Sequence, residues 1–440
     1  MKTTRLIVII VLSVLLVAGW GRTLFGGATE KEKAFNQHIE NGDDYASRGL
    51  YQLAIQEYSA VVTEDGSTEN WDKLLDLYKK RYAEDETILS DYLSAAESAV
   101  SAHPDNDSYI TTLVDLCMID DDYKTAYRNL EKAMSHDNIS DTIRDLYLKV
   151  CYAYEMDWIS YAEYQGYANG NYTVKENDNW KYIGNTGSEA DYNRRDLVYA
   201  ALVGEDGEHL INAGDRTELV DKNNVIHGFW DFIPAAAGIL SEDMIAVCKD
   251  EAYAYYNTLG DLQFGNFAYA GAFQNGKAAV KEGEQWHLID KTGAAVSGNV
   301  YADIKVNDAG QYLSDKVMVA KQDDAYHLYD QEEKMISDFA AQDMDRATED
   351  GLIAFCKDGK WGYVDMSGSE VIAPQYPAAK SFSNGLAAVS DGNKWGFIDK
   401  DGRLVIDYAF ADAGYFNADG GCMIKNEEQT WQLIIRKILK

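Results

Sequence analysis

The sequence predicts an α+β multidomain protein in which an apolar N-terminal segment, a helical segment and an all-β array follow one another along the chain. Three observations support this prediction. An apolar run follows two basic residues at the N-terminus, apolar residues then recur every three or four positions, and after residue 170 an aromatic line recurs about every 35 residues. These changes of pattern predict domains at residues 1–27, 28–165 and 170–440.

The composition narrows the possible partners. The chain has 440 residues, with 73 Asp and Glu against 40 Lys and Arg, and a net charge of −33. Binding to nucleic-acid phosphates or to anionic lipid requires clustered Lys and Arg, so this excess of acid argues against both. Hydrophobic residues make up 46% of the chain, which is too high a share for a disordered acidic tail.

The N-terminus has the pattern of an export signal. Lys2 and Arg5 precede an apolar run that continues to Trp20, and the basic end of such a segment stays inside the cell. Residues 6–25 are expected to form a single-pass membrane anchor. A cleaved signal peptide is the alternative, because residues 17–19 include small side chains at plausible cleavage positions. In both cases the bulk of the chain is expected outside the cytoplasm, at the cell membrane or secreted.

The segment up to about residue 165 has the periodicity of amphipathic helices. A small residue, a turn and then an aromatic-x-x-Ala sequence occur twice, the matching residues being Gly49, Tyr51, Ala54, Tyr123 and Ala126. This pattern resembles tetratricopeptide-type helical repeats. The resemblance implies stacked helix pairs, with the alanines allowing close packing and the tyrosines filling the grooves, and it implies a concave peptide-binding surface.

Two further features belong to the helical segment. His103-Pro104-Asp105 is expected to form a turn and cap between helices, and a last helix is expected from Ser140 to about Tyr154. Between residues 28 and 165 there are 29 Asp and Glu against 12 Lys and Arg. These acids are most simply explained as solvated helix ends, with an acidic groove for a basic peptide as the alternative.

The β segment repeats one line, which is clearest from Trp361 to Gly368 and from Trp395 to Gly402. Weaker copies begin at Trp180, Trp286 and Trp431, and degenerate ones at Glu208, Tyr253 and Tyr326. A short apolar strand and a turn precede each line, and an Asp-x-x-Gly turn and a further strand follow it. Each of the eight copies is therefore expected to form an antiparallel meander that must stack on its neighbours.

The two clean Trp-Gly lines resemble the WG β-repeat family of bacterial proteins, which implies a repeat module without a general enzymatic activity. Seven or eight such meanders would close as a β-propeller, which removes exposed sheet edges; an open β-solenoid is the alternative. The signature positions are expected to be structural: Trp180, Trp286, Trp361, Gly362, Asp365, Gly368, Trp395, Gly396, Asp399, Gly402 and Trp431.

Candidate chemistry in the β segment has simpler explanations. His209, His287 and His327 each follow the aromatic position of a copy and could line a metal-binding ring, but a variable strand position explains them better. Asp290, Asp365 and Asp399 lack the residue order of a calcium loop and are expected to cap turns.

The aromatic and cysteine residues of the β segment are also explained most simply by structural roles. The repeated tryptophans are expected in the core, with the tyrosines at 152, 154, 161, 164 and 167 as a possible platform for sugar or peptide. Cys248 and Cys356 share a strand register with Val280 and Val389 and are therefore expected to be core residues.

The sequence therefore predicts a membrane-tethered extracytoplasmic scaffold that binds a protein or peptide through its repeat surfaces. Recognition of cell-wall glycan or peptidoglycan by the β-repeat domain is the alternative. No phosphate-binding loop, nucleophile elbow or HExxH motif occurs in the sequence. No catalytic residue, cofactor or metal is therefore assigned, and an enzyme is not expected.

Overall fold

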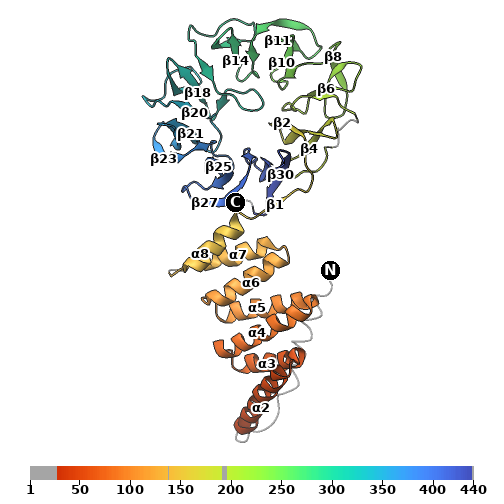
Figure 1. Cartoon of the computed structure of the whole chain (residues 1–440), viewed down its shortest axis with the longest axis vertical. Coiled ribbons are helices and arrows are strands. Elements are labelled where there is room, and N and C mark those ends of the chain that lie inside the picture. Colours follow the sequence, from red (N-terminus) through yellow and green to blue (C-terminus); the bar gives the residue numbers. More distant parts are fainter. Residues whose placement is uncertain (1–26, 137, 191–195, 439–440) are drawn as a thin grey trace. The chain divides into compact units, whose positions relative to one another are not determined.

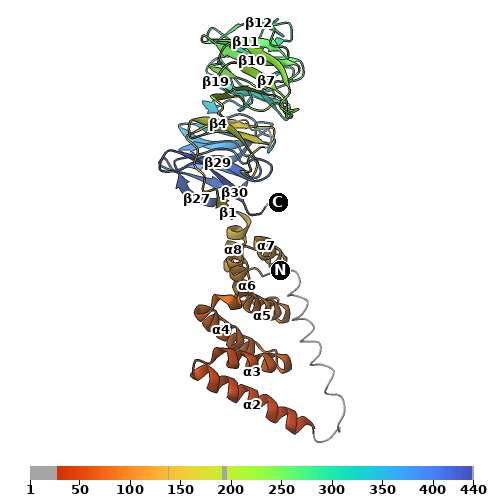
Figure 2. The ribbon, with the colours of Figure 1, turned by 90° about the vertical axis from the view of Figure 1, so that its right-hand side faces the viewer.

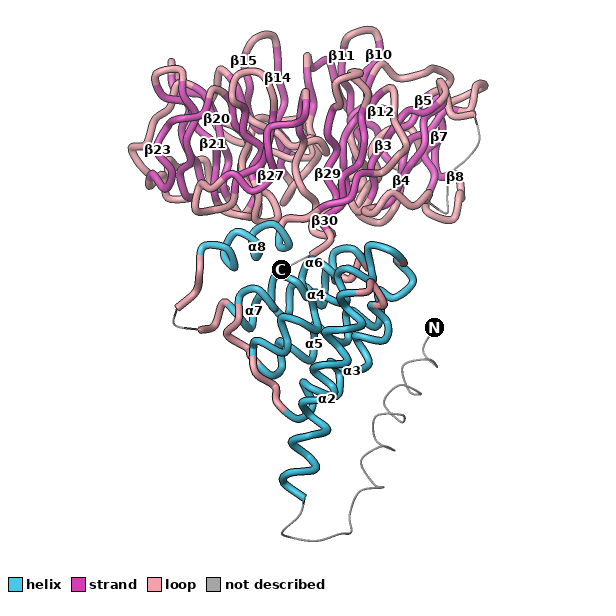
Figure 3. Tube along the Cα trace, turned by 60° about the horizontal axis from the view of Figure 1, so that its bottom comes forward, coloured by secondary structure: helices cyan, strands magenta, loops and turns pink. Residues whose placement is uncertain are grey.

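The computed structural model describes residues 27–136, 138–190 and 196–438. The chain divides into two compact units, Met1–Val150 and Cys151–Lys440. In the described residues the first unit is helical and the second is built of strands (Figure 3). The boundary lies earlier than the predicted one near residue 165, because residues 154–156 pair as a strand of the β unit and are not part of a last helix.

Helices stack one after another in the described part of the first unit (Figure 2). In chain order they are α2 (Gly27–Ser47), α3 (Tyr51–Glu64), α4 (Thr68–Glu84), the 3-10 turn η1 (Glu86–Ile88), α5 (Leu89–Ala102), α6 (Asp107–Ile119), α7 (Tyr123–Ala133) and α8 (Asp141–Cys151). Asn106 caps α6 by accepting two backbone N–H bonds, and Asp122 caps α7 through the N–H of Thr125. The cap of α6 thus lies one residue beyond the predicted turn.

The core of the stack contains the small residues that the repeat pattern singled out. Ala54 and Ala126 are fully buried, and Tyr51 and Tyr123 pack half-buried against the same core. Small side chains at these positions let neighbouring helices approach closely.

Gly49, which the repeat pattern predicts to pack between helices, has a different role. Gly49 adopts a left-handed conformation (φ 72°) just after α2, and a Cβ there would have nothing within 4 Å, so Gly49 ends the helix and does not pack. The residue that allows close approach is Gly42, since a Cβ there would lie 2.7 Å from the Tyr58 ring. The Tyr58 hydroxyl donates to Asp43 at 2.6 Å.

None of the helices in the described part of the chain combines the length and the hydropathy of a membrane-spanning segment. The anchor predicted over residues 6–25 lies outside the residues that the structure describes.

The described strands of the second unit form eight antiparallel sheets in a ring, which is a β-propeller (Figure 1). The first four blades contain these strands in chain order: blade 1, β2 (Glu163–Ala168), β3 (Asn171–Glu176) and β4 (Asn179–Gly184); blade 2, β5 (Tyr199–Ala200), β6 (His209–Asn212), β7 (Thr217–Val220) and β8 (Ile226–Trp230); blade 3, β9 (Ala236–Ala237), β10 (Met244–Lys249), β11 (Ala252–Asn257) and β12 (Leu262–Phe267); blade 4, β13 (Tyr269–Ala270), β14 (Lys277–Glu282) and β15 (Gln285–Asp290).

The remaining four blades complete the ring. They are blade 5, β16 (Asp303–Ile304), β17 (Leu313–Ser314), β18 (Val317–Gln322) and β19 (Ala325–Asp330); blade 6, β20 (Asp343–Met344), β21 (Leu352–Lys357), β22 (Lys360–Asp365) and β23 (Glu370–Tyr376); blade 7, β24 (Ala378–Ala379), β25 (Ala387–Ser390), β26 (Trp395–Ile398) and β27 (Leu404–Phe410); blade 8, β28 (Asp412–Ala413), β29 (Gly421–Lys425), β30 (Trp431–Arg436) and β1 (Tyr154–Met156).

The ring is closed by strands from the two ends of the unit. β1 pairs with β30 antiparallel, Tyr154 opposite Arg436, so the first strand of the unit completes the last blade. Across the seam between blades 8 and 1, the Asn417 side-chain amide donates to the hydroxyl of Tyr172 at 2.8 Å. This closure is the reason that the favoured propeller is observed and the open solenoid is not.

At three places, successive blades are linked by a tyrosine at the centre of the third strand. The hydroxyl groups of Tyr182, Tyr255 and Tyr363 each donate to a backbone carbonyl just after the inner strand of the next blade, at 2.8, 2.8 and 3.1 Å. An amphipathic side chain therefore fills the space between two blades and also satisfies a buried carbonyl group.

One copy of the repeat lies elsewhere than the sequence predicts. The third strand of blade 2 is β7, so its line begins at Thr217 and not at Glu208. Thr217 takes the position of the tryptophan, and Asp221 takes that of the turn aspartate. Without the aromatic residue, nothing in the sequence marks the true start of the line.

Turns after the third strands follow the expected capping chemistry. The carboxylate of Asp365 accepts hydrogen bonds from the N–H groups of Ser367 and Ser369 and from the Ser367 hydroxyl. This set of donors, the hydroxyl first, holds the pKa of Asp365 below its ordinary value. Asp290 has a lowered pKa for the same reason, with Thr292 as the main donor.

This turn predicts a specific acid sensitivity. A carboxylate with a lowered folded-state pKa stabilises the fold above the unfolded-state pKa of about 4, and this contribution is lost as the pH falls through the folded-state value. Asp365→Asn is expected to change the free energy of unfolding at neutral pH by less than about 1 kcal/mol, because Asn257 makes the same backbone contacts in blade 3. Below about pH 4 the wild type should lose stability faster than the variant in urea titrations. Parallel pH profiles for the two proteins would contradict this account.

Candidate binding site between helical repeats

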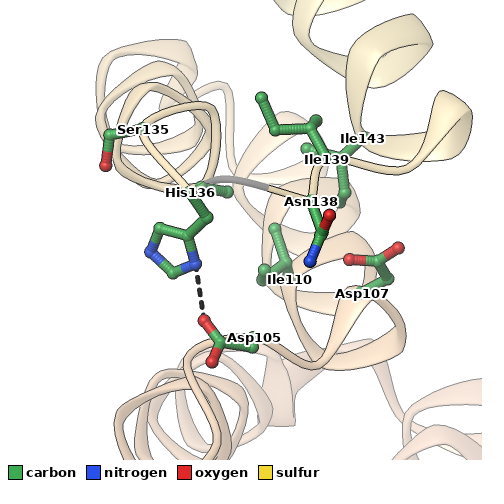
Figure 4. Close-up of a pocket in the computed structure, with 9 residues that line it drawn as sticks. Asp105, Asp107, Ile110, Ser135, His136, Asn138, Ile139 and Ile143 are labelled. Carbon is green, nitrogen blue, oxygen red and sulfur yellow. Dashed lines mark ion pairs between the residues drawn. The ribbon is translucent and has the colours of Figure 1, made fainter.

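A pocket lies in the helical unit where the loop between α5 and α6 meets the loop between α7 and α8. Its volume is about 550 Å³. The described residues that line it are Asp105, Asp107, Ile110, Ala133, Ser135, His136, Asn138, Ile139 and Ile143. Figure 4 shows the polar side chains at the two loops and the isoleucines between them. Because equivalent inter-helix loops meet here, the pocket is a product of the repeat stacking.

Apolar side chains form the base of the pocket, while polar atoms make up most of its lining. Ile110 and Ile143 are only 3% and 2% exposed, and Ala133 is also buried. Ile139 is half-buried beside them. These residues come from α6, α7, α8 and the loop before α8, so no single helix provides the floor.

The rim of the pocket is polar and acidic. The carboxylate of Asp105 forms an ion pair with Nδ1 of His136 at 2.5 Å, which joins the two loops. Among the described residues, no hydrogen bond or ion pair is recorded for the carboxylate of Asp107 or the amide of Asn138. Asp107 is half-buried in the first turn of α6, where the positive end of the helix dipole stabilises negative charge.

A second hollow of about 550 Å³ lies on the other side of the α5–α6 loop and shares Asp105 and Asp107. Here the His103 ring is within 2.6 Å of the carbonyl oxygen of Gly66, in the loop between α3 and α4. His103 thus connects the α5–α6 loop to the α3–α4 loop, and His136 connects the α7–α8 loop to the α5–α6 loop. These links fix the loops that shape both hollows.

The pocket combines features suited to a side chain with an apolar stem and a polar end. Isoleucines can cover methylene groups, while the carboxylate of Asp107 and the amide of Asn138 can bind a polar head. No residue of this pocket was assigned a binding role from the sequence. The sequences His103–Asp107 and His136–Asp141 are similar, but their proximity depends on the stacking of helices more than 30 residues apart and is not encoded locally.

The predicted signature tryptophans lie in the β unit and pack within or between blades. Trp286 is buried with its ring 5.0 Å from that of Tyr269. Trp361, Trp395 and Trp431 are half-buried against separate blade cores, and Trp180 packs against the core between blades 1 and 2. These residues are therefore not gathered into one site.

The glycine of the Trp-Gly pair has a steric role. A Cβ on Gly362 would lie 2.5 Å from the carbonyl oxygen of Ile372, and one on Gly396 would lie 2.6 Å from that of Ile406. At both places the outer strand carries a register shift and presses against the third strand. In blade 3 the arrangement is reversed, with Ala254 on the third strand and Gly265 on the outer one.

The same packing explains two of the three histidines. His287 and His327 occupy the glycine position in blades 4 and 5, where only isolated bridges lie outside the third strand, so a large side chain fits. His209 is not equivalent to them, contrary to the sequence interpretation. It lies on the second strand of blade 2, buried with its ring 4.9 Å from Tyr182. In the described residues, no group of three or more His, Cys, Asp or Glu side chains could hold a metal ion.

The turn residues of the two clean lines adopt the conformations that the turn requires. Gly368 and Gly402 have φ angles of 83° and 78°. Asp399 is 3% exposed and pairs with Arg403 at 2.7 Å.

The tyrosines proposed as a platform do not form one. Tyr161 is fully buried, and the rings of Tyr164 and Tyr167 contact the ring of Tyr172 in blade 1 at tilted angles. Tyr152 and Tyr154 pack against the core of blades 7 and 8. All five cysteines are buried and unpaired.

This architecture defines a repeat protein, in which a helical unit precedes an eight-bladed propeller. A family model described as "WG containing repeat" matches residues 361–395 and 395–427. Residues 361–427 therefore contain WG repeats, which confirms the resemblance that their Trp-Gly lines indicated.

Solved structures similar to the chain include Hsv2p of Kluyveromyces lactis, with 10% identity over 64% of this chain and 96% of that one at a TM-score of 0.36. The TPR domain of P58(IPK) has 20% identity over 27% of this chain and 33% of that one, with a TM-score of 0.19. BBS1N, solved in complex with ARL6DN, has 9% identity over 65% and 97% of the two chains, with a TM-score of 0.33. No curated protein matches the chain significantly.

Proposed function

We propose that the chain is a scaffold that binds a protein or peptide partner through its repeat surfaces and performs no catalysis. The observation that carries this proposal is the pocket at the α5–α6 and α7–α8 loops, which has apolar side chains at its base. At its rim, the side chains of Asp107 and Asn138 have no hydrogen-bond or ion-pair partner among the described residues. A pocket of this kind can hold one side chain of a partner, and the repeat stack offers further surface beside it.

The location belongs to the same proposal. The basic residues Lys2 and Arg5 and the apolar run that follows support a protein tethered by residues 6–25, with its bulk outside the cytoplasm. Mass spectrometry of the mature N-terminus distinguishes a retained anchor from a cleaved signal peptide.

Capture experiments with the full chain test the function. Immobilised protein is exposed to the soluble proteins of the cell envelope and, separately, to isolated peptidoglycan. A defined protein should be retained from the first sample, and retention should fall at least tenfold for Ile139→Asp, because a carboxylate in the apolar floor excludes an apolar stem. Ile119→Asp is the matched control, since Ile119 is 56% exposed and does not line the pocket.

The glycan alternative predicts the opposite pattern. If peptidoglycan is retained and no protein is captured, the β-repeat domain is a cell-wall recognition module and the proposal is wrong. If neither sample is retained, the scaffold function itself fails.

A further inference from the structure

We propose that the pocket between the helical repeats is a receptor for a lysine or arginine side chain of the partner. This inference rests on the proposed function and specifies the chemistry of the bound segment. The argument depends on the shape of the cavity, the distribution of polar and apolar groups around it, and the charge of the surrounding unit.

The cavity has room for a long side chain. Its volume of about 550 Å³ exceeds that of any single amino-acid side chain, so an extended stem and part of the adjoining backbone can enter together. Ile139 is the half-buried apolar side chain of the lining, and Ile110, Ile143 and Ala133 lie beneath it with only a small part of their surface exposed. Burial of each methylene group of a stem against such a surface is favourable.

The polar groups are placed to select a cation. Asp105 is already paired with His136 at 2.5 Å. Asp107 is different, because the described residues supply no cation to its half-buried carboxylate at the edge of the apolar floor. A lysine ammonium or an arginine guanidinium would give this carboxylate a charge-assisted partner, and the carbonyl oxygen of Asn138 could accept a second hydrogen bond.

A second feature disfavours the other possible occupants. Between residues 28 and 150 the chain contains 26 Asp and Glu against 12 Lys and Arg, so the field around the pocket is negative. An acidic side chain would be repelled by the carboxylate of Asp107, and a neutral polar side chain would leave that carboxylate without a cationic partner. A basic segment is attracted during approach and paired after binding.

The test uses four labelled heptapeptides that differ only at the central residue. The probe is Gly-Gly-Ile-Lys-Ile-Gly-Gly, and its variants carry norleucine, acetyl-lysine or glutamate in place of the lysine. Fluorescence anisotropy with the full chain should give an affinity for the lysine peptide at least tenfold higher than for the norleucine and acetyl-lysine peptides. The glutamate peptide should bind weakest, and the advantage of lysine should shrink as salt is added.

Two substitutions test whether Asp107 is responsible for the preference for lysine over norleucine. Asp107→Asn should abolish the advantage of lysine over norleucine and leave norleucine binding unchanged, because the change removes the charge and keeps the shape. Asp115→Asn is the matched control, since Asp115 is an exposed acid on the same helix outside the pocket, and it should retain the full advantage. Circular dichroism of both variants checks that the helices remain folded.

The outcomes separate this inference from the proposed function. Equal binding of lysine and norleucine peptides, or equal effects of the two substitutions, overturns the cation receptor. If no heptapeptide binds but the captured partner is still lost in Ile139→Asp, the pocket binds a different chemistry and the scaffold function stands. If the partner is not captured at all, the proposed function fails first.

Discussion

Replacing Gly362 with valine is expected to lower the free energy of unfolding of the β unit by about 3 kcal/mol, at the upper end of the usual range for overpacking. A Cβ at this position would lie 2.5 Å from the carbonyl oxygen of Ile372 and 2.7 Å from the nitrogen of Pro374. Both are backbone atoms of β23, so the strain cannot be relieved by a side-chain rotation. The outer strand must move away from β22, which weakens its pairing. Chemical denaturation followed by tryptophan fluorescence measures the loss.

Gly298→Val is the matched control for this experiment. A Cβ on Gly298 would have nothing within 4 Å, and its backbone does not adopt a left-handed conformation. Its substitution is therefore expected to change stability by no more than about 0.5 kcal/mol. Similar losses in the two variants would mean that the conformational freedom of glycine, and not the space at β23, is what matters at residue 362.

Asn417→Leu is expected to destabilise the β unit by about 3 kcal/mol, because several buried polar groups lose their partner at once. Asn417 is 6% exposed, and its amide donates to the Tyr172 hydroxyl across the seam of the ring. Its side-chain oxygen accepts from the N–H groups of Asp419 at 3.0 Å and Gly421 at 2.9 Å. Leucine has a similar size but neither donates nor accepts. Urea titration measures the total effect, and amide hydrogen exchange in β3 and β29 reports whether the seam opens first.

The matched control is Asn307→Leu in blade 5. The side-chain oxygen of Asn307 accepts the N–H of Gln311 at 2.9 Å, as that of Asn417 accepts the N–H of Gly421. Its amide donates to the side chain of Gln311 in the same loop and not to another blade. It should therefore lose only about 1 kcal/mol. The difference between the two substitutions isolates the contribution of the cross-seam contacts. Equal losses would show that ring closure does not depend on Asn417.

The repeat pattern predicted much of the β unit because each blade is specified locally. Alternating apolar residues, a turn aspartate such as Asp365 and a left-handed residue such as Gly368 fix one meander without reference to the rest of the chain. The prediction failed where that local information is missing. In blade 2 the aromatic residue is replaced by Thr217, and the copy was therefore placed too early, at Glu208.

The candidate site was less accessible to prediction. Asp107 and Ile143 are 36 positions apart, and nothing in their local sequence indicates that they share a cavity. The turn at residues 103–105 was interpreted as a helix connection alone. A pocket formed by loops of successive repeats depends on how closely the helices stack, and this depends on small buried residues such as Ala126 of α7.

The sequence by itself determined the succession of a helical part and a β part, the repeat of about 35 residues and the Trp-Gly lines, because all of these are periodic properties of neighbouring residues. Tertiary structure alone decided that the β part closes as a ring. The closing strand is Tyr154–Met156, which helical periodicity had assigned to the first domain. It pairs with the edge of β30 that would otherwise be unpaired, and no local pattern encodes a partner at the other end of the unit.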